Sequence, residues 1–88
     1  MDGHKPSIGR ITEVDIVLEC GGRIAGVEVK ASSTVTGGDF KGLRKLHQAV
    51  ENRFAAGIVV YDGEAVVPFG SQRYAVPICS LWDTERHS

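Results

Sequence analysis

The 88-residue sequence has only two cysteines, three prolines and no long apolar run. Cys20 and Cys79 lie far apart and lack the short spacing of metal-ligand pairs, so we expect free thiols rather than a disulfide framework. No stretch approaches the roughly 18 apolar residues of a membrane span, and the polar start lacks the apolar core of a signal peptide. The sequence therefore predicts a cytoplasmic protein without a membrane partner.

An excess of charge of one sign is also missing. Ten lysines and arginines oppose eleven acidic residues, which gives a net charge of −1. Proteins that coat nucleic acid are strongly basic, so a polyanion can bind here only at a local site. The composition is typical of one compact domain, which we expect at residues 12–82 between a polar segment at 1–11 and a polar tail at 83–88. Because a core this small gains from a partner, two alternatives stay open, a homodimer or a neighbouring domain.

A β-hairpin is the clearest local feature. Residues 12–20 alternate between apolar and polar side chains, which predicts a strand with two unlike faces. Gly21 and Gly22 then supply two residues that adopt positive φ without strain, as a tight hairpin turn requires. The second strand is predicted over residues 23–31.

The register of this hairpin follows from its turn. If the turn contains only the two glycines, Cys20 lies opposite Arg23, and counting back along both strands places Asp15 opposite Glu28. Lys30 follows two residues later on the same side of its strand. The same register gives the other side of the hairpin a wholly apolar set of residues.

Helical periodicity begins after a Ser/Thr/Gly-rich segment in which Thr36 or Asp39 is the expected cap. The apolar positions from Phe40 to Phe54 recur at helical spacing, so we expect an amphipathic helix that covers one face of a sheet and ends before Gly57. A buried strand parallel to the second one is predicted at 57–61. Two lesser strands at 64–69 and 73–78 are expected at a sheet edge. The predicted fold class is α/β, of the α+β kind, ordered β-β-α-β with C-terminal strands.

The hairpin also carries the candidate chemistry. Directly opposed residues have Cβ atoms about 4.5 to 5.5 Å apart, so Asp15 and Glu28 would repel one another unless a cation compensates. Mg²⁺ binds carboxylate oxygens and keeps several waters, which makes this pair a candidate metal site. Lys30 would place an ammonium beside it that orients water or neutralises charge on a phosphate.

Plainer interpretations of the same residues stay open. The acidic pair and Lys30 can decorate a solvated sheet face, with Glu13 and Lys30 as a surface ion pair worth at most about 1 kcal/mol. A second basic group lies on one flank of the expected helix, where it can bind a phosphate backbone or simply face solvent. These candidate nucleic-acid-binding residues are Lys41, Arg44 and Lys45.

Glu13-Val-Asp15-Ile-Val-Leu-Glu19 and Val27-Glu28-Val-Lys30-Ala-Ser32 resemble the signature of the PD-(D/E)xK nuclease superfamily. The resemblance implies a restriction-endonuclease-like core in which Asp15 and Glu28 bind Mg²⁺ or Mn²⁺ and Lys30 serves hydrolysis. The implied substrate is nucleic acid, with DNA favoured over RNA.

The downstream sequence extends the resemblance. The strings Asp39-Phe-Lys-Gly-Leu-Arg-Lys-Leu46 and Val76-Pro-Ile-Cys-Ser-Leu-Trp82 are similar to the C-terminal nuclease-like domain of unknown function that is fused to many prokaryotic AAA-type ATPases. An AAA-type ATPase is therefore an implied partner. No Gly-x-x-x-x-Gly-Lys-Ser/Thr loop occurs, so the nucleotide-binding part itself is not in this sequence.

One departure from the superfamily bears on activity. Its core opens with a helix and a strand before the aspartate strand, and residues 1–11 are too few to supply both. We therefore keep two functions open from the sequence. The first is a metal-dependent nuclease-type domain, and the second is a catalytically inactive nuclease-fold module that regulates or docks an AAA-type ATPase.

Overall fold

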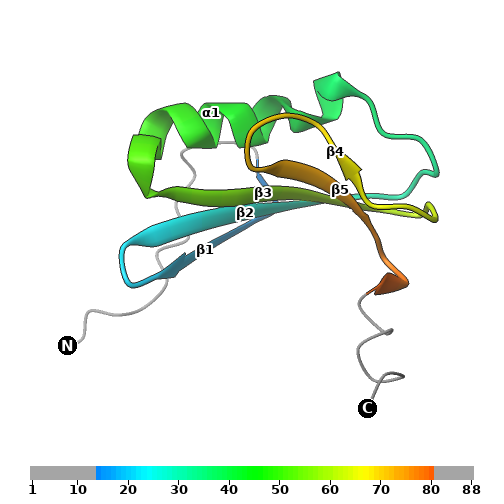
Figure 1. The fold of residues 1–88 in the computed structure, drawn as a ribbon, viewed down its shortest axis with the longest axis horizontal. Coiled ribbons are helices and arrows are strands. Elements are labelled where there is room, and N and C mark those ends of the chain that lie inside the picture. The colour runs from blue at the N-terminus through cyan, green and yellow to red at the C-terminus, as the bar shows by residue number, and fades with distance from the viewer. Residues whose placement is uncertain (1–13, 81–88) are drawn as a thin grey trace, which may run out of the picture.

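The computed structural model describes residues 14–80 as a five-stranded mixed sheet with one α-helix, which confirms the predicted fold class (Figure 1). The strands lie in the order β1-β2-β3-β5-β4. β1 and β2 are antiparallel, β2, β3 and β5 are parallel, and β4 is antiparallel to β5. The strands are β1 (Ile16–Cys20), β2 (Arg23–Lys30), β3 (Phe54–Tyr61), β4 (Val67–Pro68) and β5 (Arg73–Pro77).

The predicted hairpin and its register are confirmed. Cys20 pairs with Arg23, and the ladder continues to Ile16 opposite Val27. The two turn glycines have φ of 61° and 84°, the left-handed region that glycine adopts without steric cost. β1 begins at Ile16, later than predicted, and Thr12 and Glu13 lie outside the described residues.

The helical segment is shorter than its periodicity predicted. A 3-10 helix, η1 (Gly37–Phe40), leads into α1 (Lys41–Val50), and a second one, η2 (Glu51–Arg53), follows it. Placing Phe54 in the helix was wrong, because Glu51 takes a left-handed φ of 54° that ends α1. Phe54 instead begins β3 and is still buried. The apolar periodicity therefore continues to Phe54, although the backbone there is a strand and no longer a helix.

The C-terminal strands also differ from expectation. β5 was expected at an edge, but it pairs with β3 on one side and β4 on the other. Pro77 is tolerated because, in the described sheet, β4 pairs only with Tyr74 and Ala75, so β5 has an open edge on that side at Pro77. The edge is taken by β4, a two-residue strand that contains Pro68.

The segments η1, α1 and η2 lie on one side of the sheet (Figure 1). α1 approaches the sheet above two glycines, Gly26 of β2 and Gly57 of β3, and a Cβ added at either position would meet Leu43. This contact is part of a buried core between helix and sheet. The residues of this core are Ile24, Phe40, Leu43, Leu46, Phe54, Val59, Tyr61 and Ala75. Val60 is also buried, but it is the register partner of Val29 and lies on the opposite face of the sheet.

The opposite sheet face carries the apolar side of the hairpin and is exposed in part. Leu18 and Val29 are 52% and 56% exposed, and Ile16 and Tyr74 are exposed as well. The segments η1, α1 and η2 lie on the other face (Figure 1). The described helix therefore covers the side of β2 that carries Glu28 and Lys30, since side chains alternate from Ile24 and Gly26 onward.

Two further observations bear on the sequence predictions. Cys20 and Cys79 are both exposed free thiols, as expected. Within the described part of the chain, no helix has the length and apolar character needed to cross a membrane.

Candidate functional site

The candidate site lies at the carboxyl end of β2, where the parallel strands β2 and β3 both end. Lys30, the last residue of β2, is the register partner of Tyr61, the last residue of β3. In open sheets with parallel strands, ligands bind at this carboxyl edge. The position of the acidic and basic residues agrees with that rule.

Asp15 and Glu28 are brought together, as the register predicted. Asp15 lies one residue before β1, and its backbone N–H donates to Oε1 of Glu28 at 3.2 Å. In turn, the backbone N–H of Val29 donates to Oδ2 of Asp15 at 3.0 Å. Each carboxylate therefore accepts a hydrogen bond from the backbone of the other's strand, and these bonds continue the hairpin contact beyond its last ladder pair.

Lys30 contacts Asp39, a pairing that the sequence did not suggest, whereas the suggested partner Glu13 lies outside the described residues. Its ammonium Nζ lies 2.6 Å from Oδ2 of Asp39, which stands at the start of the helical segment. The same carboxylate oxygen accepts the backbone N–H of Thr36 at 2.8 Å. The hydrogen bond from Lys30, followed by that from Thr36, lowers the pKa of Asp39 below its usual value.

Three of these side chains line one small cavity. Glu28, Lys30 and Asp39 surround a space of about 230 Å³ together with Val29 and Val59. Asp39 was predicted only as a helix cap, and its place beside Lys30 was missed. The sequence held part of the signal for this position. Asp39 follows Thr36 by three residues, which is the spacing of a capping box at the start of a helical segment.

The donor set fits a hard divalent cation in part. Among residues 14–80, no group of three or more histidine, cysteine, aspartate or glutamate side chains is arranged to hold a metal ion. Mg²⁺, however, is commonly held through one or two carboxylates and completes its shell with water and substrate phosphate. Asp15 uses one carboxylate oxygen to accept the Val29 N–H, and the second oxygen is the atom that would bind such a cation.

The three predicted nucleic-acid-binding residues all lie exposed on α1. Arg44 donates from Nη1 to the carbonyl oxygen of Gly37 at 2.9 Å, so it also fastens the start of η1. The exposure of Lys41 and Lys45 is compatible either with phosphate binding or with a solvated helix face.

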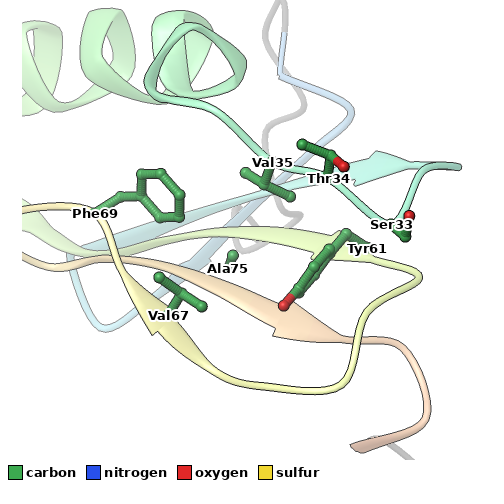
Figure 2. A pocket seen from close by; sticks show the side chains of 7 residues that line it. All are labelled: Ser33, Thr34, Val35, Tyr61, Val67, Phe69 and Ala75. Atoms are coloured by element: carbon green, nitrogen blue, oxygen red, sulfur yellow. The ribbon is translucent and has the colours of Figure 1, made fainter.

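A second cavity lies on the same side of the sheet. Figure 2 shows it between the segment at 33–35 and the strands β3, β4 and β5. Its volume is about 270 Å³. Tyr61 lines this cavity, and its hydroxyl group donates a hydrogen bond to the carbonyl oxygen of Ala65 at 2.6 Å. None of the residues that line this cavity is charged, so the acidic and basic residues of the candidate site lie outside it. The lining residues are Ser33, Thr34, Val35, Tyr61, Val67, Phe69 and Ala75.

A family model described as a domain of unknown function (DUF4143) matches residues 8–81, which is most of the chain. Neither the curated proteins nor the solved structures contain a significant match.

Proposed function

Because the chain belongs to the DUF4143 family, described as a domain of unknown function, we propose its activity from the site. We propose a metal-dependent nuclease-type domain that hydrolyses phosphodiester bonds of nucleic acid, with DNA as the expected substrate. In this proposal Asp15 and Glu28 bind Mg²⁺ or Mn²⁺, and Lys30 serves the attacking water. The proposed fold relationship is to the restriction-endonuclease-like core of the PD-(D/E)xK superfamily.

The observation that carries the proposal is the contact between Asp15 and Glu28. The 3.2 Å hydrogen bond from the Asp15 backbone to the Glu28 carboxylate holds two acidic side chains together at the end of the hairpin. Mg²⁺ is commonly held through one or two carboxylates and completes its shell with water and substrate phosphate, so two neighbouring carboxylates suit a cation of this kind.

The side chains gathered at the site support the same conclusion. Among the described residues, Asp15, Glu28 and Asp39 bring three carboxylates and Lys30 brings one ammonium. Carboxylate oxygens are the ligands that a hard divalent cation prefers. The chemistry supplied by such a cation, when bound, is polarisation of a phosphoryl oxygen and activation of water.

Lys30 supplies the remaining group. Its ammonium has three N–H donors, and the bond to Asp39 occupies one of them. The others can orient a water or stabilise negative charge on the phosphoryl oxygens. Exposed Lys41 and Lys45 on α1 are the proposed contacts to the backbone of the nucleic acid. The free thiols Cys20 and Cys79 support a cytoplasmic location, because thiols stay reduced there.

The test is cleavage of plasmid and single-stranded DNA by the purified protein in Mg²⁺ and in Mn²⁺. Asp15→Asn and Glu28→Gln are suitable variants, because an amide oxygen can still accept the Val29 or Asp15 N–H and preserve the hairpin. Lys30→Ala tests the ammonium. We expect each change to lower the rate by roughly a hundredfold or more.

Glu64→Gln serves as the control, since it removes a carboxylate on an exposed residue away from the site. It should cleave like the wild type. Calorimetric titration with Mn²⁺ gives a second readout, in which the wild type binds and Asp15→Asn does not. Cleavage that persists unchanged in Asp15→Asn and Glu28→Gln would come from a contaminant and contradict the proposal.

The exposed apolar sheet face favours a second candidate function. Leu18 and Val29 lie on this face, and a cavity of about 320 Å³ opens beside Val29, Val60 and Ile78. Parallel sheets are normally covered on both faces, so this surface suits a protein partner. We propose, as the alternative, a catalytically inactive nuclease-fold module that docks on an AAA-type ATPase. This alternative function predicts that the wild type does not cleave DNA. It also predicts that the wild type binds such an ATPase in size-exclusion chromatography and that Leu18→Lys abolishes this binding.

A further inference from the structure

Lys30 is anchored by a carboxylate from a different part of the fold. Its ammonium lies 2.6 Å from Asp39 Oδ2, although Glu28 is only two residues away in the sequence and lines the same cavity. A lysine side chain has four rotatable bonds and loses substantial rotamer entropy when it is held in one position. A specific anchor is therefore needed to keep the ammonium inside the cavity rather than in solvent.

Asp39 is itself held firmly. Its Oδ2 accepts the Thr36 backbone N–H at 2.8 Å, and its own backbone N–H donates to the Thr36 carbonyl at 3.0 Å. The next residue, Phe40, is 1% exposed and stacks on Phe69. The buried ring fixes the start of the helical segment, and with it the position of the Asp39 carboxylate.

From these contacts we propose that Asp39 is the positioning residue for Lys30. This inference rests on the proposed function, and it adds a fourth residue to that site. Asp39 touches the ammonium and not the substrate, so its role is to hold the Lys30 Nζ beside Glu28 in an orientation that leaves donors available to a phosphate. The depressed pKa of Asp39 agrees with this role, because the carboxylate stays charged over the range in which nucleic acids are bound.

The first measurement needs no enzymatic activity. Brief acetylation with acetic anhydride, followed by mass spectrometry, reports the reactivity of each lysine amine. Lys30 should react more slowly than the exposed Lys41 and Lys45, which serve as references within the same molecule. Asp39→Asn should raise the reactivity of Lys30 roughly two- to fivefold, the range expected of a partly exposed ion pair.

Asp39→Glu and Glu64→Gln complete the set of variants. Asp39→Glu keeps the charge and should restore part of the protection of Lys30. Glu64→Gln should leave Lys30 unchanged. Thermal unfolding of each variant shows whether it is folded, and if Asp39→Asn does not fold, Asp39→Glu and the wild-type ratio of Lys30 to Lys41 still test the contact.

Cleavage of plasmid DNA in Mn²⁺ is the second measurement. Asp39→Asn should lower kcat roughly ten- to a hundredfold with little change in KM, because a misplaced catalytic group mainly affects the chemical step. Lys30 that is already as reactive as Lys41 in the wild type would overturn the inference. So would undiminished cleavage by Asp39→Asn, since Asp39 would then only sequester the amine. A wild type that does not cleave overturns the proposed function itself, and the positioning role with it, even where acetylation confirms the ion pair.

Discussion

Gly26 of β2 and Gly57 of β3 are register partners in neighbouring parallel strands, and both lie beneath Leu43 of α1. Because glycine has no side chain, α1 packs close to the sheet at these two positions. This close approach fixes where the helical segment begins. It thereby brings Asp39 of η1 to the end of β2, where Lys30 is located.

Gly26→Ala should destabilise the fold. The added Cβ would lie 2.7 Å from Leu43 Cδ2 and 2.8 Å from Leu46 Cδ2, and both leucines are fully buried with little room to move. We expect a loss of about 1 to 3 kcal/mol in the free energy of unfolding, as for other overpacked cores. Urea denaturation measures it. Gly37→Ala is the matched control, because a Cβ there meets nothing within 4 Å.

Gly22→Ala should weaken the hairpin through its backbone rather than its packing. Space is open at this position, but its φ of 84° is one that residues with a side chain rarely adopt. The expected loss of unfolding free energy is about 1 to 2 kcal/mol. Urea denaturation beside Gly37→Ala again provides the measurement. Stability equal to that of the control would show that the turn does not constrain the hairpin.

The ion pair between Lys30 and Asp39 predicts a dependence of stability on pH. Because folding lowers the pKa of Asp39 below 3.8, its contribution is fully present above pH 3.8 and is lost as the pH falls through the lower folded value. The difference in unfolding free energy between wild type and Asp39→Asn should therefore be largest at neutral pH and shrink in acid. Chemical denaturation across this range tests it, and a difference that grows on acidification would contradict the assigned sign.

Val29 and Val59 test whether the apolar face is open to solvent. Val29 is 56% exposed on that face, whereas Val59 is 0% exposed beneath the helix. Val29→Thr should change the free energy of unfolding by no more than about 0.5 kcal/mol. Val59→Thr should cost about 1 to 3 kcal/mol, because it buries a hydroxyl group. Equal losses in both variants would mean that another chain covers Val29 in solution, and a dependence on protein concentration would identify a homodimer.

The hairpin and its register could be predicted from sequence because their causes are local. Gly21 and Gly22 set the turn, and the period-2 alternation sets which residues face one another. The pairing of Asp15 with Glu28 followed by counting alone. The helix was also predictable, but its end was not: periodicity carried on to Phe54, while a single left-handed residue, Glu51, turned the chain into β3.

Pairings between distant segments could not be obtained in the same way. No short sequence pattern indicates that β5 lies between β3 and β4. Likewise, none indicates that Gly26 and Gly57 lie side by side in contact with Leu43. Lys30 had nearer acidic residues in the sequence, yet packing of the helix onto those two glycines gave it Asp39. Short-range sterics and alternation thus placed the acidic pair from the sequence alone. Only the close packing of helix on sheet, which depends on residues some thirty positions apart, decided which carboxylate holds the ammonium.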